Sequence, residues 1–196
     1  MVENWFATPI YYNDIDICTA AKEEIINGYN TLEKLNILTN FSGTSSISYN
    51  TEIRDVINHF NMINTKKLII SECNSYLSSI GISFNVIELI DSWVIGSKGK
   101  QFQGEHDHGY VDNHISGIFY AETAIGSSPI IFSQPNPYNQ HITISNSNTQ
   151  YAANMVYKVI ENRIIIFPSY LRHRVPSSSN LDGRRLALVF NARIKI

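Results

Sequence analysis

The stretch RLALVFNARI at residues 185–194 is the last of about eight short β-rich runs that follow Gly81. These runs are rich in β-branched and aromatic residues, and turn residues separate them. About eight strands in roughly 115 residues leave no room for crossover helices, which is typical of an antiparallel sandwich, jelly roll or barrel. The predicted strands are Ser83–Ile95, Ile115–Ala121, Pro129–Phe132, Ile142–Ile144, Val156–Ile160, Arg163–Phe167, Arg172–Val175 and Arg185–Ile194.

The last strand has two chemically different faces. One face is large and apolar and is expected to pack in the core, whereas the other combines one cation with small side chains and leaves room for a ligand. A buried arginine without a partner is costly, so we expect an anion opposite Arg185, either a ligand or a structural Asp or Glu. The apolar face carries Leu186, Leu188 and Phe190, and the other carries Arg185, Ala187, Val189 and Asn191.

The first 81 residues have a different pattern, in which apolar residues recur with helical spacing. We therefore predict one domain, with an N-terminal strand and supporting helices at 1–81 and a β core at 82–196. The expected N-terminal elements are an edge strand within Trp5–Tyr12, a helix over Ile15–Leu38 broken near Gly28, and a helix over Asn64–Leu77 that Asn64 could cap and Gly81 follows.

Composition does not indicate a nucleic-acid or membrane partner, although a locally basic cleft stays open. Fifteen basic residues stand against seventeen acidic ones, so no overall positive field would attract nucleic acid or an anionic membrane. The segment MVENWFATPIYY lacks the pattern of a signal peptide, and the apolar runs are too short to cross a bilayer. Cys18 and Cys73 form no CxxC pair, which favours two free thiols in a reducing compartment. We expect a cytoplasmic protein.

Histidines are concentrated in EHDHGYVDNH at residues 105–114. On an extended segment His106 and His108 project to the same side, about 7 Å apart at Cα, while Asp107 points away. That spacing lets two imidazoles bind one metal ion at about 2.1 Å each, although surface histidines in a polar loop are as common as ligands. We expect His114, at the start of a strand, to be a surface or supporting residue.

A third histidine, His173, follows the apolar strand at 163–167. A lone histidine there could be a core or loop residue. Two histidines at HxH spacing, a third about 65 residues later and then a basic residue on a late strand indicate a non-haem iron site.

Five segments, in order, carry a resemblance to a known family. The chain resembles the 2-oxoglutarate/iron(II) oxygenase superfamily, in its prolyl-hydroxylase-like branch, and especially a group of small oxygenases from marine bacteria and their phages. The segments are WFATPIYYNDI (5–15), SWVIGSKGKQFQGEHDH (92–108), HISGIFY (114–120), IIIFPSYLRHRVP (164–176) and RRLALVFN (184–191).

The resemblance implies a double-stranded β-helix (a jelly roll) and a site at one open end. His106, His108 and His173 would hold Fe(II), and Tyr120 and Arg185 would bind the distal carboxylate of 2-oxoglutarate. With O2, the implied reaction hydroxylates an unidentified small-molecule or side-chain substrate and releases succinate and CO2.

One position departs from the superfamily, which usually has HxD where this chain has a second histidine. The group that the chain most resembles often has histidine there too. Whether His108 or a nearby aspartate, Asp107 or Asp112, is the second ligand stays open.

Two other functions fit the same residues. A three-histidine dioxygenase of the cupin type would not use 2-oxoglutarate, and its Arg185 would bind the carboxylate of the substrate itself. A jelly-roll binding or structural module would bind metal only incidentally. The sequence leaves the substrate and the oligomeric state open.

Overall fold

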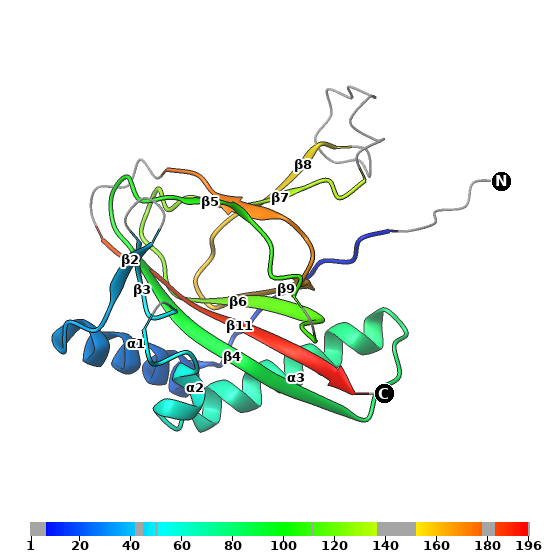
Figure 1. Ribbon diagram of the computed structural model, residues 1–196, viewed down its shortest axis with the longest axis horizontal. Coiled ribbons are helices and arrows are strands. Elements are labelled where there is room, and N and C mark those ends of the chain that lie inside the picture. The colour runs from blue at the N-terminus through cyan, green and yellow to red at the C-terminus, as the bar shows by residue number, and fades with distance from the viewer. Residues whose placement is uncertain are drawn as a thin grey trace.

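The protein is described by a computed structural model that covers residues 7–41, 45–49, 51–110, 112–136, 152–177 and 183–195. Its strands form two antiparallel sheets, of seven and four strands (Figure 1). The large sheet has the order β1 (Tyr11–Asp14), β9 (Arg163–Pro168), β6 (Ile115–Glu122), β11 (Arg185–Lys195), β4 (Val86–Ser97), β3 (Ser45–Ile47), β2 (Thr39–Phe41). The small sheet has the order β5 (Gln103–His106), β10 (His173–Val175), β7 (Ile130–Ser133), β8 (Asn154–Tyr157).

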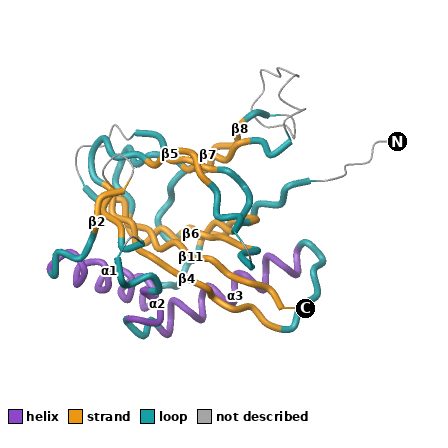
Figure 2. The backbone as a smooth tube through the Cα atoms, in the orientation of Figure 1, coloured by secondary structure: helices purple, strands orange, loops and turns teal. Residues whose placement is uncertain are grey.

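Three helices cover the face of the large sheet that turns away from the small sheet (Figure 2). They are α1 (Thr19–Lys34), α2 (Val56–His59) and α3 (Ile63–Ser79). This mainly β arrangement, with helices outside a double-stranded β-helix, confirms the predicted fold. In the part of the chain that the structure describes, no helix is long and apolar enough to span a membrane.

The alternation along β11 separates two hydrophobic cores. Leu186, Leu188 and Phe190 pack against the helices, whereas Ala187 and Val189 face the space between the two sheets. Both sets are buried, which accounts for the continuous burial of β11 from Arg185 to Ala192. The predicted division of this strand into a packing face and a cavity face is confirmed.

Glycine leaves space around helix α1 at two positions, one where the helix meets the large sheet and one where it meets the segment between α2 and α3. A Cβ atom on Gly96 of β4 would lie 2.2 Å from the hydroxyl oxygen of Tyr29, and one on Gly28 would lie 2.5 Å from Met62 Cε. The helix runs without interruption through Gly28, so the predicted break there is wrong. Gly28 serves packing and not a bend, since a side chain would collide with the buried Met62.

The other N-terminal predictions need smaller corrections. Helix α3 begins one residue before Asn64, so Asn64 is not its N-cap. The carboxylate of Glu24, on α1, instead accepts hydrogen bonds from the backbone N–H groups of Asn64 and Thr65. Gly81 follows the end of α3 with φ +73°, as predicted. The edge strand β1 begins near the end of the predicted range. Trp5, Phe6 and the predicted strand Ile142–Ile144 lie outside the described residues.

Cys18 and Cys73 are free, as predicted, and both are buried.

Candidate active site

His106 and His173 are direct partners across the antiparallel pair β5–β10 of the small sheet. Their ring centroids lie 4.4 Å apart. Residues opposite each other in an antiparallel pair project to the same face, so the pairing alone brings together two histidines that are 67 positions apart.

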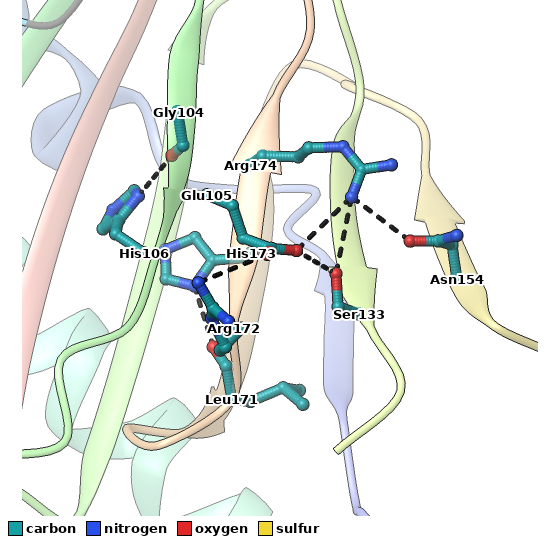
Figure 3. A network of polar contacts seen from close by, with 9 residues as sticks. All are labelled: Gly104, Glu105, His106, Ser133, Asn154, Leu171, Arg172, His173 and Arg174. Atoms are coloured by element: carbon teal, nitrogen blue, oxygen red, sulfur yellow. Dashed lines mark hydrogen bonds and ion pairs between the residues drawn. The ribbon is translucent and has the colours of Figure 1, made fainter. Parts of the chain in front are cut away.

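The outer face of the same strands carries a polar network (Figure 3). Glu105, next to His106, forms ion pairs with Arg172, just before β10, at 3.3 Å and with Arg174, on β10, at 3.5 Å. Glu105 also accepts a hydrogen bond from Ser133 on β7. Arg174 also donates to Asn154 on β8 at 3.2 Å. These contacts connect all four strands of the small sheet.

His108 reaches the same point from beyond the end of β5. Its backbone N–H donates to the carbonyl of Ser169 at 2.8 Å, and its side chain is buried. One ring nitrogen from each of His106, His108 and His173 lies within 4.8 Å of the other two. The structure thus brings together the three histidines that the sequence nominated, and their role as metal ligands stays a prediction.

Hydrogen bonds fix the tautomer of two of these histidines. His106 Nδ1 donates to the carbonyl of Gly104 at 2.8 Å, and His173 Nδ1 donates to the carbonyl of Leu171 at 2.9 Å. A carbonyl oxygen only accepts, so each Nδ1 carries a proton, and in the neutral imidazole Nε2 is the nitrogen with the lone pair. Metal-bound histidines in proteins are held in this way.

His108 is held by side chains of the large sheet. Its Nδ1 lies 3.1 Å from Ser116 Oγ on β6 and 3.2 Å from Asn191 Oδ1 on β11. The cluster therefore spans both sheets, with two histidines on the small sheet and the third fixed against the large one.

Burial keeps two members of the cluster, His108 and His173, neutral. Desolvation lowers the pKa of His173 to about 3 and that of His108 to about 4, and the neighbouring histidines add to both effects. Neutral imidazoles at neutral pH are the form that binds a divalent transition metal.

The remaining predicted candidates lie outside the cluster. Asp107 is exposed and borders the cavity, its carboxylate accepts a hydrogen bond from the backbone N–H of Gly109, and it does not join the cluster. Asp112 pairs with Arg193 at 3.1 Å. His114 is exposed, and its Nδ1 accepts a hydrogen bond from the backbone of Ile194.

A cavity of about 240 Å³ opens beside the three histidines. Its walls are mostly apolar and aromatic, which suits the exclusion of water from a bound ligand. It is lined by Ile47, Tyr49, Trp93, Ile95, Gln103, His106, Asp107, His108, Tyr110, Ile118, Ile130, Phe167, His173, Val175 and Val189.

Arg185 and Tyr120 lie deeper in the same interior. The guanidinium carbon of Arg185 stands 5.0 Å from the centroid of the Tyr120 ring, and its Nη2 donates to the Tyr120 hydroxyl at 3.4 Å. Both side chains are buried. Arg185 lines a small recess next to the main cavity, and Val175 borders both spaces.

The guanidinium of Arg185 has unsatisfied hydrogen-bonding capacity. Its Nε is buried without a hydrogen-bond partner, and among the described residues no carboxylate lies within ion-pair distance of it. A buried cation in this state fits an anionic ligand, one of the two alternatives that the sequence left open for the anion opposite Arg185. The three clustered histidines and the Arg185 guanidinium, with its unpaired Nε, together fit a divalent iron ion and the far carboxylate of a dicarboxylic oxoacid.

Comparison with known families identifies the chain. The family model described as "Putative 2OG-Fe(II) oxygenase" matches residues 91–191, more than half of the chain. The chain belongs to this family. The matched range contains all five nominated site residues, and iron(II) and 2-oxoglutarate are the cofactors of the family.

Solved structures of other oxygenases share the fold. A prolyl-4-hydroxylase from Pseudomonas putida superposes with a TM-score of 0.60 at 8% identity, covering 95% of this chain and 92% of that one. A prolyl hydroxylase from Trichoplax adhaerens, in complex with a hypoxia-inducible-factor peptide, gives 0.59 at 12% identity over 94% and 83% of the two chains. HygX from Streptomyces hygroscopicus, with nickel and 2-oxoglutarate bound, gives 0.60 at 8% identity over 95% and 83%. A search of curated protein sequences finds no match.

Sequence reasoning missed the residues that hold the oxygenase histidines in place. Ser116 and Asn191 contact His108, yet neither was nominated. The alternation of residues 185–191 put Asn191 on the cavity face, and a polar residue there was the available signal.

Proposed function

We propose that this oxygenase is an iron(II)- and 2-oxoglutarate-dependent dioxygenase that hydroxylates a small molecule or a peptide side chain. The observation that carries the proposal is the cluster of His106, His108 and His173 at the mouth of an apolar cavity. The Nε of Arg185, buried without a hydrogen-bond partner, supports the binding of an oxoacid.

Each residue has a distinct role in this proposal. His106, His108 and His173 hold the metal through Nε2, and Arg185 and Tyr120 bind the far carboxylate of the oxoacid. When bound, iron(II) and 2-oxoglutarate supply the oxidation, in which O2 delivers one oxygen atom to the substrate and the other to succinate as CO2 leaves. The apolar walls exclude water from the reacting groups.

The ligand set makes the site more positive than the usual one. Three neutral histidines leave the full charge of the divalent ion, whereas an HxD site cancels one unit of it. A doubly charged oxoacid would neutralise this site completely, so we expect oxoacid binding to depend strongly on both of its carboxylates.

Two observations bear on the class of substrate. The Trichoplax enzyme was solved with a peptide, and the overall charge of −2 offers no attraction for nucleic acid. A small molecule or a side chain of another protein remains the proposed class.

The test is an anaerobic titration of 2-oxoglutarate into the iron-loaded protein, followed by the metal-to-ligand absorption band of the chelate. Arg185→Leu should weaken oxoacid binding by about 2–5 kcal/mol, roughly 30-fold or more, because the far carboxylate loses its counter-charge. Arg184→Gln is the matched control, since Arg184 contacts Glu122 and Asn30 on the helix side of the sheet. In air, the unaltered protein should release succinate.

Two results would contradict the proposal. One is the absence of the band and of succinate from the iron-loaded protein, which would leave a three-histidine dioxygenase independent of 2-oxoglutarate. The other is loss of the band in Arg184→Gln with retention in Arg185→Leu.

A further inference from the structure

His108 stands where the superfamily usually has a carboxylate, and a row of polar side chains lies directly behind it. Asp91 on β4, Asn191 on β11 and Ser116 on β6 are cross-strand partners on three adjacent strands. Partners in register share a face, so this row lies on the inner face of the large sheet. Tyr110 joins it from the segment after His108.

The hydrogen bonds in this row have a defined direction. The Tyr110 hydroxyl donates to Asp91 Oδ2 at 3.2 Å, and its oxygen accepts from Asn191 Nδ2 at 2.7 Å. The amide of Asn191 is thereby oriented with Nδ2 toward Tyr110 and Oδ1 toward His108. Ser116 Oγ also donates to Asn191 Oδ1, at 2.7 Å.

The orientation of Asn191 determines where His108 carries its proton. Asn191 Oδ1 can only accept, and the Ser116 hydroxyl already uses its one O–H to donate a hydrogen bond to that oxygen. Both groups therefore accept from His108 Nδ1, at 3.2 and 3.1 Å. His108 must be the Nδ1–H tautomer, with the lone pair of Nε2 free.

The three histidines reach the same tautomer by different means. His106 and His173 use backbone carbonyls two residues away, which any sequence supplies. His108 depends on side chains from three strands, and Asn191 and Ser116 are fully buried. The burial of the amide makes a wrong orientation costly, since it would leave donors and acceptors unpaired.

We infer that Asn191 is a positioning residue for His108, and that Ser116, Tyr110 and Asp91 orient its amide so that His108 offers Nε2 to the metal. This inference rests on the proposed function, because it assigns His108 as a ligand. Asn191 touches neither metal nor oxoacid in this assignment. Loss of such a supporting hydrogen bond typically weakens metal binding by about 10–100-fold.

The first measurement needs no metal. Two-bond proton–nitrogen NMR spectra of the apoprotein with 15N-labelled histidine rings distinguish the two tautomers, and His108→Gln identifies the signals of His108. The unaltered protein should show His108 as Nδ1–H, and Asn191→Leu should show a mixture. An Nε2–H tautomer of His108 in the unaltered protein, or no change in Asn191→Leu, would overturn the inference.

The second measurement is the affinity for Co(II), followed by its d–d absorption. Asn191→Leu should lose about 10–100-fold, and Asn191→Asp, which keeps the acceptor, should bind at least as tightly as the unaltered protein. Equal losses in Asn191→Leu and Asn191→Asp would indicate a packing role and contradict the inference.

Two milder variants keep the test decisive if Asn191→Leu does not fold. The first, Tyr110→Phe, alters an exposed side chain. The second, Ser116→Ala, removes a buried hydroxyl. Its matched control is Ser48→Ala, because Ser48 is equally buried and accepts a hydrogen bond from the backbone of Val94. Both test variants should show the second tautomer of His108, and Ser48→Ala should not. A protein with the expected tautomer that fails to bind Co(II) would overturn the proposed function and leave the hydrogen-bond chain intact.

Discussion

His106 and His173 face each other across β5–β10, so two proposed iron ligands are placed by a single cross-strand pairing. His106 is the last residue of β5 and His173 the first of β10. The geometry of the pair therefore depends on the backbone register of the small sheet. Side-chain chemistry on the outer face should matter less.

Removing either member of this pair should abolish stable iron binding. We expect one iron(II) per chain in the unaltered protein, and none retained after His106→Ala or His173→Ala, because two histidines alone hold the ion too weakly. Metal analysis of the purified proteins measures this, with circular dichroism to confirm the fold. His114→Ala is the matched control, and unchanged stoichiometry in both site variants would remove the site as assigned.

The second ligand position is decided by comparing His108→Ala with Asp107→Ala. His108 is buried in the cluster and Asp107 is exposed at the cavity, so only the first change should weaken iron binding. Titration of iron into the two apoproteins gives the answer. The reverse order of affinities would make Asp107 the carboxylate ligand.

The outer network of the small sheet should contribute little energy despite its several contacts. Glu105 is exposed, and exposed ion pairs contribute about 0–1 kcal/mol. We expect Glu105→Gln to lower the free energy of unfolding by less than about 1 kcal/mol and to leave the iron stoichiometry unchanged. Denaturant unfolding and metal analysis test both parts, and loss of iron in this variant would show that the network positions His106.

The stability of the N-terminal region should depend on pH through Glu24. Burial opposes ionisation of its carboxylate, but hydrogen bonds from Asn64 and Thr65 outweigh this and lower the pKa below 4.5. Since the folded-state pKa is depressed, the stabilisation is complete above pH 4.5 and is lost as the pH falls through the folded-state value.

Glu24→Gln should therefore cost about 0.5–2 kcal/mol at neutral pH, as for other helix caps, and progressively less in acid. Thermal unfolding at several pH values measures the difference between the two proteins. Glu23→Gln, on an exposed neighbour, is the control. A difference that stays constant down to acid pH would mean that the ionised carboxylate has no special role.

The sequence predicted the strand content and the alternation of β11, because period-two patterning is local. It could not give the register of strands that are distant in the chain. The row of Asp91, Asn191 and Ser116 exists only through the pairing of β4 with β11 and of β11 with β6. For the same reason Asn191 was placed on the correct face but was not recognised as a partner of His108.

Local rules failed where tertiary contacts supplied an alternative. Glycine predicted a break in α1, but Gly28 lies within a continuous helix, where its lack of a side chain leaves room for Met62. Asn64 matched the preferences for a helix cap, but Glu24 from another helix serves its backbone N–H instead. The short elements β2, β3, β5 and α2 were not predicted, since three or four residues carry too little pattern.

The division of the histidines between the two sheets makes the proposed metal a cross-link. His106 and His173 belong to the small sheet, and His108 is anchored to β6 and β11 of the large one. In the apoprotein the small sheet could open without disturbing the helix-backed core, whereas in the metal-bound protein opening would require breaking a ligand bond. The backbone amides of β5 and β10 should then exchange with deuterium through local opening before metal is added, and only through global unfolding afterwards.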